Sequence, residues 1–309
     1  MTTPRLAITL GDPRGIGPEI VRAALGDARV RERCAAVVVG PRGAGLDVDE
    51  PVGEWRGGDA AAAAGRLAGF AVERAVSLAM AGDVAGIVTA PIDKAALLAG
   101  GFDFPGHTEM LAALAGADVA MMLAATRATG GAAAPLRVVL ATTHVPLRDV
   151  PRLLTRRTLE HAIRVTRAGL RDWFGMAEPR IALCALNPHA GDGGRFGRED
   201  DELLAPVARA EGVAGPFPAD TVFVRAMRGE FDAVVAPYHD VGMTAIKVAA
   251  FGTAVNVTLG LPFPRTSPDH GTALDIAGKG IADPGSMIEA ILLCARIAAE
   301  RRRPAGARG

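Results

Sequence analysis

The stretch "RIALCALNPHAGDGGRFGRED" (180–200) joins a short apolar run to a glycine-rich turn that carries a histidine. The run 180–188 is short and ends at a proline, which is typical of a strand that is buried on both faces. In open α/β sheets, ligands bind beyond the carboxyl ends of the strands. We therefore expect His189 to lie at a functional edge of a sheet.

The same alternation continues along the chain and predicts its fold class. Longer alanine-, leucine- and arginine-rich segments with helical spacing separate the short apolar runs. This pattern indicates an α/β protein, with helices on both faces of a mainly parallel sheet. The predicted strands are 5–11, 35–40, 84–91, 136–144, 180–188, 231–240 and 252–260. The predicted helices are 17–26, 59–81, 91–99, 109–115, 152–173, 200–211, 221–228 and 284–302.

Composition narrows the classes of function. The chain has 309 residues, of which 50% are hydrophobic, so it can bury the core of one large domain or of two lobes. Lys and Arg total 34, as do Asp and Glu, and this balance argues against nucleic-acid or membrane-surface partners. We see neither a signal peptide nor an apolar run long enough for a membrane span, and we expect a cytoplasmic protein.

The cysteines are few and widely separated. Cys34, Cys184 and Cys294 form no CxxC pair, and their odd number argues against a disulfide framework. We expect three free thiols that are buried as small hydrophobic side chains in a reducing compartment.

Three histidines share similar surroundings. His144, His189 and His239 each follow an apolar run, in "ATTH", "LNPH" and "APYH". Three imidazoles at one sheet edge can bind a divalent metal and leave positions open for a substrate. Asp240 and Asp149 are candidates to orient an imidazole. The alternative is that each histidine simply caps a loop, because the spacings match no local metal motif.

Two further groups of residues favour an anionic ligand. In "GHTEML", His107 precedes Thr108, which we expect to be the N-cap of a helix whose free N–H groups attract an anion. Lys247, Asn256 and Arg265 are polar residues in apolar runs, and a buried cation needs a partner such as a phosphate or a carboxylate. The alternatives are an ordinary helix cap and internal salt bridges.

Two glycine-rich segments are candidates for backbone approach to a ligand. "GDPRGIGPEI" (11–20) lacks the spacing of the dinucleotide fingerprint, so we interpret it as a strand–turn–helix in which Asp12 faces the site. "SPDHGTALDIAGKGIADPGS" (267–286) has small residues that would let a flat ligand approach closely. His270 is a candidate to stack on or hydrogen-bond to an adenine.

Nine blocks in order resemble the 4-hydroxythreonine-4-phosphate dehydrogenase family, the NAD-dependent enzymes of pyridoxal 5′-phosphate biosynthesis. They are "GDPRGIGPEI", "TAPIDK", "GHTEML", "ATTHVPLRDV", "NPHAGDGGRFGRED", "PADT", "YHDVGM", "NVTLGLPFPRTS" and "DHGTALDIAGKG", and they cover nearly the whole chain. The last block also resembles the cofactor loop of isopropylmalate and isocitrate dehydrogenases.

The resemblance implies a two-lobed α/β/α sandwich of the isocitrate and isopropylmalate dehydrogenase type. Its active site would lie in the interdomain cleft at the interface of a homodimer. Lobe I would comprise approximately residues 1–130 and 265–309, and lobe II residues 131–264. NAD would bind without the usual glycine fingerprint, and a divalent metal (zinc, cobalt or magnesium) would be the second cofactor.

The resemblance also implies roles for individual residues. His144, His189 and His239 would bind the metal. The substrate would contact His107, Thr108, Lys247, Asn256 and Arg265, largely through its phosphate. The cofactor would contact Asp269, His270, Gly271, Asp275 and Gly278.

The implied reaction is oxidation of 4-phosphohydroxy-L-threonine to a 3-keto acid, which decarboxylates to 3-amino-2-oxopropyl phosphate. The metal would act as a Lewis acid on the substrate hydroxyl, and Asp220 in "PADT" is our candidate for the base.

One position departs from the family pattern. The block that usually reads "YHDQG" is "YHDVG" here, with Val241 in place of an amide. One alternative is therefore a paralogous D-threonate or D-erythronate 4-phosphate dehydrogenase. Another, of a different class, is a non-catalytic protein that binds a phosphorylated ligand. The intact Lys247, Asn256 and Arg265 disfavour a more distant branch that oxidises aromatic cis-dihydrodiols.

Overall fold

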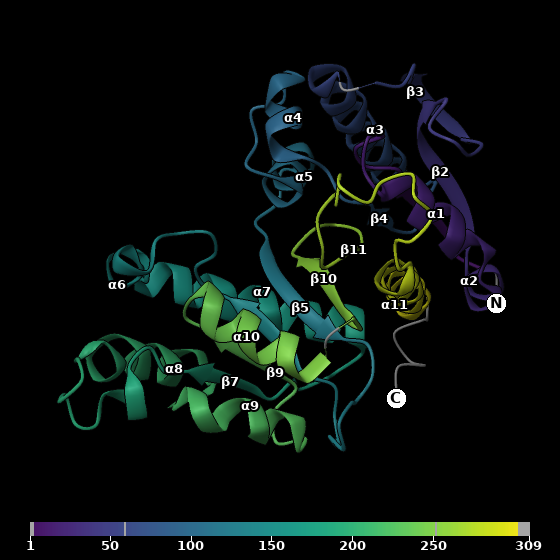
Figure 1. Ribbon diagram of the computed structural model, residues 1–309. Coiled ribbons are helices and arrows are strands. Elements are labelled where there is room, and N and C mark those ends of the chain that lie inside the picture. The colour runs from purple at the N-terminus through teal and green to yellow at the C-terminus, as the bar shows by residue number, and fades with distance from the viewer. Residues whose placement is uncertain (1–2, 59, 251, 302–309) are drawn as a thin grey trace. The chain divides into compact units, whose positions relative to one another are not determined.

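The computed structural model describes residues 3–58, 60–250 and 252–301 (Figure 1). The chain divides into two compact units, Met1–Val119 with Val255–Gly309, and Ala120–Ala254. The divisions thus fall near 119 and 254, whereas the sequence analysis places them near 130 and 264. Residues 122–124 pair with a strand of the second unit, and residues 255–257 pair with a strand of the first.

The first unit contains a mixed sheet in which most strand pairs are parallel. Its strands are ordered β3 (Glu50–Glu54), β2 (Ala35–Arg42), β1 (Arg5–Thr9), β4 (Ile87–Thr89), β11 (Arg265–Pro268) and β10 (Ala254–Leu259). The β10–β11 pair is antiparallel, and the other neighbouring pairs are parallel. Leu6 to Thr9 are buried, as the continuous apolar run of β1 predicts for a strand covered on both faces.

Helices cover both faces of this sheet. They are α1 (Gly17–Gly26), α2 (Ala28–Arg33), α3 (Ala61–Ala81), α4 (Lys94–Ala99), α5 (His107–Ala115) and α11 (Gly285–Arg301). The helix α3 packs on β1 to β4 and against α4 and α5, whereas α11 packs on β4 and β11 beside α1 and α2. Figure 1 shows α3 and α11 on opposite sides of the strands.

The second unit repeats this layered arrangement. Its strands are ordered β5 (Ala120–Ala125), β6 (Arg137–Leu140), β9 (Ala233–Ala236), β7 (Ile181–Cys184) and β8 (Ala214–Phe217). Only the β5–β6 pair is antiparallel among the pairs described. Its helices are α6 (Val150–Leu153), α7 (Arg156–Phe174), α8 (Ala205–Glu211), α9 (Ala219–Met227) and α10 (His239–Ala250).

The helix α10 lies close to the sheet of the second unit. It packs on β5, β6 and β9, with Ile246 in the apolar core and Val241 against it. A Cβ added at Gly242 would lie 2.7 Å from Cδ2 of Leu140 and 2.9 Å from Cγ1 of Val138, so a larger residue there would require these side chains to shift. The block "YHDVGM" therefore includes residues that pack α10 onto the sheet.

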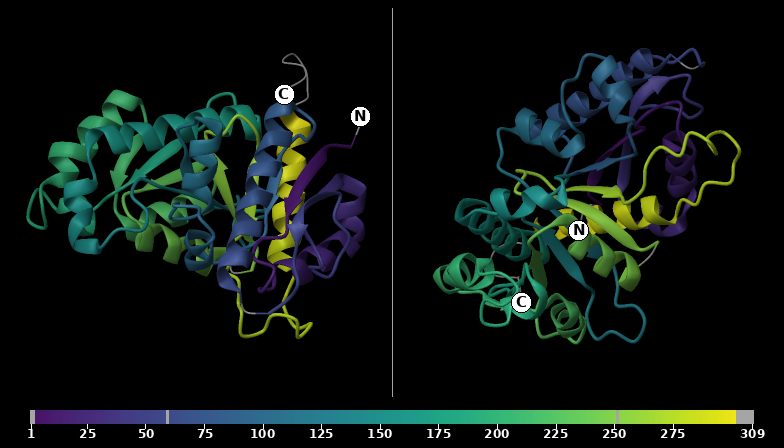
Figure 2. Two further views of the ribbon diagram at one scale, coloured as in Figure 1. Left: turned by 90° about the horizontal axis from the view of Figure 1, so that it is seen from above. Right: turned by 60° about the vertical axis from the view of Figure 1, so that its left-hand side comes forward.

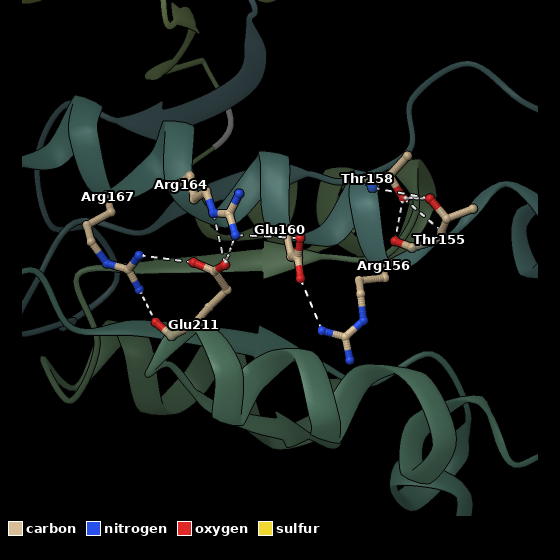
Figure 3. Close-up of polar contacts among 7 residues, drawn as sticks. All are labelled: Thr155, Arg156, Thr158, Glu160, Arg164, Arg167 and Glu211. Carbon is tan, nitrogen blue, oxygen red and sulfur yellow. Dashed lines mark hydrogen bonds and ion pairs between the residues drawn. The ribbon is translucent and has the colours of Figure 1, made fainter.

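The helix α7 covers the other face of the second unit and is fixed at its start by a reciprocal cap. Thr155 and Thr158 exchange side-chain to backbone hydrogen bonds, as Figure 3 shows. Farther along α7, Arg164 and Arg167 reach Glu211 at the end of α8. Burial raises the pKa of Glu211, but the hydrogen bonds from these two arginines outweigh it and hold the pKa below its usual value.

The structure confirms all seven predicted strands and refines the predicted helices. The helix expected at 152–173 is two helices, because Thr155 adopts an extended conformation to cap α7. The sequence analysis missed β3, β5, β8, β11, α2 and α10.

Within the described residues, Cys34, Cys184 and Cys294 are free and buried, as predicted. No helix in that part of the chain has the length and apolar character needed to span a membrane. Residue 59, where one predicted helix begins, and residue 302, where the last one ends, lie outside the described residues.

The contact between α3 and α4 depends on Gly65. A Cβ added there would lie 1.8 Å from the carbonyl oxygen of Ala96, far inside van der Waals contact.

We predict that Gly65→Ala lowers the free energy of unfolding by about 1–3 kcal/mol, because the clash outweighs the better helix propensity of alanine. Urea denaturation measures the change. Gly26→Ala at the end of α1 is the matched control, since an added Cβ there meets nothing within 4 Å. Equal stabilities of the two variants would contradict the prediction.

Candidate functional site

In the first unit, a buried arginine brings together residues from several elements. The side chain of Arg265, 2% exposed, donates hydrogen bonds to Oγ1 of Thr258 (2.9 Å) and to Oγ1 of Thr89 (2.5 Å). We call these three residues, together with His107 and Asn256, the Arg265 cluster. They come from the ends of β4 and β10, the start of β11 and the first turn of α5.

Strand register explains why these side chains meet. In the antiparallel β10–β11 pair, Asn256 lies opposite Ser267 and Val257 opposite Thr266, which places Thr258 opposite Arg265. Residues opposite each other project to the same face, and so do residues two apart on one strand. Asn256, Thr258 and Arg265 therefore share one face of the pair.

The Arg265 cluster contains polar atoms that have no partner within the chain. Nε of Arg265, Nε2 of His107 and Oδ1 of Asn256 are all buried and make no hydrogen bond. Because a buried polar atom without a partner costs free energy, three such atoms in one cluster point to a ligand that would bind them.

The electrostatics of the cluster favour an anion. Burial lowers the pKa of Arg265 to about 10, so the guanidinium remains charged at neutral pH. Its hydrogen bonds go to two neutral hydroxyls, and the carboxylate of Glu109 is close enough to raise its pKa without forming an ion pair with it. Burial, together with the nearby charge of Arg265, holds the pKa of His107 well below its usual 6.5. A neutral imidazole beside a cation suits the binding of a phosphate or a carboxylate.

The structure corrects the expected position of Thr108. The N-cap of α5 is Gly106, and His107 begins the helix, so Thr108 lies inside the first turn. The backbone of Gly106 is extended, with φ 174° and ψ −169°, which is the type of conformation that an N-cap requires. The sequence favours threonine as the N-cap because its hydroxyl can accept a backbone N–H. In the structure, however, the N-cap is two residues earlier, at Gly106.

In the second unit, two of the three predicted metal ligands lie together. The ring centroids of His144 and His239 are 5.3 Å apart. Nδ1 of His239 is 2.8 Å from Oδ1 of Asp240, a contact that holds the imidazole in one orientation. The other predicted orienting residue, Asp149, forms an ion pair with Arg152 at 3.9 Å.

The third predicted ligand, His189, lies on an exposed turn. It adopts φ 54° and ψ 28°, and its ring centroid is 6.4 Å from that of Phe196. Within the described residues, no three His, Cys, Asp or Glu side chains are grouped closely enough to hold a metal ion. Two imidazoles, one of them held by a carboxylate, are nevertheless side chains of the type that bind zinc or cobalt.

A buried carboxylate that the sequence analysis missed holds the segment before His189. Asp200 is fully buried, and it accepts the backbone N–H groups of Leu186 (2.8 Å) and Asn187 (3.0 Å). The side chain of Asn187 donates to both Asp200 and Glu199. The signal was the acidic pair at the end of "NPHAGDGGRFGRED", but only the folded turn shows which backbone groups it binds.

The remaining predicted residues of the second unit lie on helices. Lys247 is half-buried on α10, and Asp220 is exposed in the first turn of α9. Neither position by itself identifies a ligand.

The predicted cofactor segment of the first unit has no regular helix or strand between 271 and 284. The backbone N–H of Asp269 donates to Oγ of Ser286 (3.3 Å), and Nδ1 of His270 is 3.1 Å from the carbonyl oxygen of Gly271. Gly278 has φ 74°, a left-handed conformation that favours glycine, and Asp275 is exposed.

Asp12 is buried, and Arg14 neutralises its charge. Nη2 of Arg14 lies 2.6 Å from Oδ2 of Asp12, and both Nε and the backbone N–H of Arg14 donate to Oδ1. The carboxylate is thus occupied by its own turn.

We predict that His107 makes the stability of the unliganded protein dependent on pH. Because the folded-state pKa is depressed, the unfolded chain binds more protons below about pH 6.5, and the free energy of unfolding falls as the pH decreases. Between about pH 8 and about pH 5, the wild type should lose roughly 1–2 kcal/mol more than His107→Gln. Urea denaturation at both values measures this difference. His270→Gln, which replaces an exposed histidine, is the control, and an equal loss in wild type and His107→Gln would refute the assignment.

Comparison with known proteins adds to this geometry. The family model described as pyridoxal phosphate biosynthetic protein PdxA matches residues 24–294. A 4-hydroxythreonine-4-phosphate dehydrogenase from Paracoccus denitrificans is 46% identical over 96% of this chain and 98% of the relative. A protein from Bradyrhizobium diazoefficiens named for D-threonate 4-phosphate dehydrogenase activity is 43% identical over 97% of this chain and 98% of its own.

Solved structures agree with the predicted fold class. The crystal structure of 4-hydroxythreonine-4-phosphate dehydrogenase from Klebsiella pneumoniae has a TM-score of 0.82 and 39% identity, and it covers 96% of this chain and 100% of that one. Isocitrate dehydrogenase from Methylococcus capsulatus has a TM-score of 0.50 at 16% identity over 94% of this chain and 84% of its own, a likeness of fold alone. The expected α/β fold of the isocitrate dehydrogenase type is thereby confirmed. From the family match and the near-complete coverage of these relatives, the chain belongs to the family of the pyridoxal phosphate biosynthetic protein PdxA.

Proposed function

We propose that the protein is an NAD-dependent and divalent-metal-dependent dehydrogenase that acts on 4-phosphohydroxy-L-threonine. Its product is a 3-keto acid, which loses carbon dioxide to give 3-amino-2-oxopropyl phosphate in pyridoxal 5′-phosphate biosynthesis. Family membership and the names of the relatives support this reaction. A homodimer located in the cytoplasm is part of the same proposal.

The observation that carries the proposal is the buried charge of Arg265, which forms no direct ion pair within the described residues. Removing a guanidinium from water costs free energy unless an anion or strong hydrogen bonds replace its hydration. The free Nε of Arg265 and the unpaired Nε2 of His107 can both donate to a phosphate oxygen, depending on the imidazole tautomer. Asn256 supplies an acceptor for a hydroxyl or an amine of the substrate, Lys247 adds a positive charge, and Thr108 contacts the substrate beside His107.

The second part of the proposal concerns the two cofactors. His144, His189 and His239 hold the metal, with Asp240 orienting His239. Bound cofactors would supply Lewis-acid activation of the substrate hydroxyl and an acceptor for the hydride that leaves the carbinol carbon. Asp220 accepts the hydroxyl proton.

The cofactor-binding segment completes the proposed site. Asp269, His270, Gly271, Asp275 and Gly278 contact the adenosine end of NAD. Of these, Gly271 and Gly278 have open space where a Cβ would be, so their backbone is accessible to a flat ligand.

A second candidate is oxidation of D-threonate 4-phosphate. The Bradyrhizobium diazoefficiens relative is named for this substrate at an identity similar to that of the 4-hydroxythreonine-4-phosphate dehydrogenases. D-Erythronate 4-phosphate is the related alternative. Val241, which replaces the usual amide of the family, packs against the apolar core of the second unit.

We predict metal-dependent reduction of NAD⁺ with 4-phosphohydroxy-L-threonine. Purified protein is assayed by NADH absorbance with this compound, D-threonate 4-phosphate, D-erythronate 4-phosphate and an aromatic cis-dihydrodiol, each with and without a chelator. The first compound should give the highest kcat/KM, and the chelator should abolish turnover because the hydroxyl is no longer activated.

Each other outcome assigns a different function. A higher kcat/KM for D-threonate 4-phosphate or D-erythronate 4-phosphate would change the assigned substrate, and the proposed phosphate and metal sites would still stand. Full turnover in the chelator, with metal content verified as zero, would exclude the role of the histidines. Folded, metal-loaded protein that binds the phosphorylated compounds without forming NADH would be a binding protein rather than an enzyme.

We also predict that Arg265→Lys lowers kcat/KM for the phosphorylated substrate by at least about tenfold. A lysine keeps the charge but loses the planar fork that reaches Thr89, Thr258 and the ligand together. Steady-state kinetics measure the effect, and Arg33→Lys on the exposed side of α2 is the matched control. If Arg265→Lys matched the control, the guanidinium would have no part in binding the phosphate.

A further inference from the structure

The start of α1 holds the proposed cofactor segment, although its glycines do not form a dinucleotide fingerprint. Glu19, half-buried in the first turn of α1, accepts the backbone N–H of Gly278 at Oε2 (2.9 Å) and that of Ala282 at Oε1 (3.2 Å). One carboxylate thus joins two points of a segment that lies about 260 residues away in the sequence. In the right-hand view of Figure 2, this segment, in yellow, runs beside the purple α1.

A second contact fixes the beginning of the same segment. The backbone N–H of Ile16 donates to the carbonyl oxygen of Thr272 (2.9 Å). Gly15 makes this approach possible, because a Cβ there would lie 2.8 Å from that oxygen. The turn before α1 and the first turn of α1 therefore hold the segment at residues 272, 278 and 282.

The segment needs such support because it has little regular structure of its own. No helix or strand occurs between 271 and 284, and internal backbone hydrogen bonds within it join only Ala273 to Ile276 and Ile276 to Lys279 in the described interactions. Ala273 has φ 43°, a left-handed conformation that is unfavourable for a residue with a Cβ. Leu274 is 44% exposed and Ile281 is 67% exposed, so apolar side chains project into solvent.

We propose that Glu19 is a positioning residue for the dinucleotide. Its carboxylate holds residues 272–282 in the conformation that receives the adenosine end of the cofactor, without touching the cofactor itself. A charged acceptor on backbone N–H groups forms stronger hydrogen bonds than a neutral one, and it preorganises the segment before the cofactor binds. This inference rests on the proposed function, which assigns the segment to cofactor binding.

The first measurement uses the protein without cofactor. Amide hydrogen exchange of residues 272–283 is compared in wild type, Glu19→Gln and Glu19→Ala. Exchange should be fastest in Glu19→Ala and intermediate in Glu19→Gln, whose amide oxygen can still accept one of the two bonds. Glu32→Gln, which removes an exposed glutamate from α2, is the matched control and should match wild type. Unchanged exchange in Glu19→Ala would overturn the inference, whatever the protein binds.

The second measurement follows NADH and NADPH binding by fluorescence titration without substrate. The Kd of the preferred dinucleotide should rise by at least about tenfold in Glu19→Ala, since binding must then order the segment. It should rise less in Glu19→Gln. KM for the dinucleotide should rise in parallel with the Kd, while kcat should change little. A general loss of structure would instead lower kcat as well.

The outcomes separate this inference from the function on which it rests. Tight binding of NADH by wild type and Glu19→Ala alike would overturn the role of Glu19 and keep the cofactor assignment. Wild-type protein that binds neither dinucleotide would overturn both. Because Glu19→Ala can lose stability, thermal denaturation accompanies each titration, and Glu19→Gln provides a comparison in a variant that loses only one of the two hydrogen bonds.

Discussion

A guanidinium with 2% exposure needs groups nearby that compensate for its lost hydration, and Arg265 imposes this requirement on the first unit. Thr89 and Thr258 satisfy two of its N–H groups, and they reach it only because β4 and β10 lie near β11. Nε of Arg265 has no partner, and it is the donor that the proposed anion would occupy, with neutral His107 beside it. The same constraint therefore accounts for the packing of the strand ends and for the negative charge of the proposed ligand.

Carboxylates organise the irregular segments that carry the other proposed functions. Asp200 accepts backbone N–H groups before His189, Asp12 accepts the backbone N–H of Arg14 within its own turn, and Glu19 accepts that of Gly278. In each case side-chain oxygens replace the hydrogen bonds that a helix or a strand would otherwise supply. The segments can thus remain irregular, with their side chains or backbone accessible, without leaving these N–H groups unpaired.

The helix α10 combines a proposed site with packing. His239 and Asp240 lie in its first turn and contact each other, whereas Val241 and Gly242 face the core of the second unit. Successive residues on a helix point in different directions, so one short block can serve both purposes. The replacement of the family's amide by Val241 fits this division, since a valine suits the apolar neighbours that surround it.

The sequence alone determined the alternation of strands and helices, because strands buried on both faces are short apolar runs. It also placed His144 and His239 after strands and identified Arg265 as a buried cation. It did not reveal β5, whose "AMMLAA" has no strand-like alternation, or α10, which begins directly after Tyr238. Only the tertiary structure could join Thr89 to Arg265 across 176 positions, or Glu19 to Gly278 across 259. Such contacts depend on strand order and on how closely helices approach the sheet, and no local pattern of residues records either.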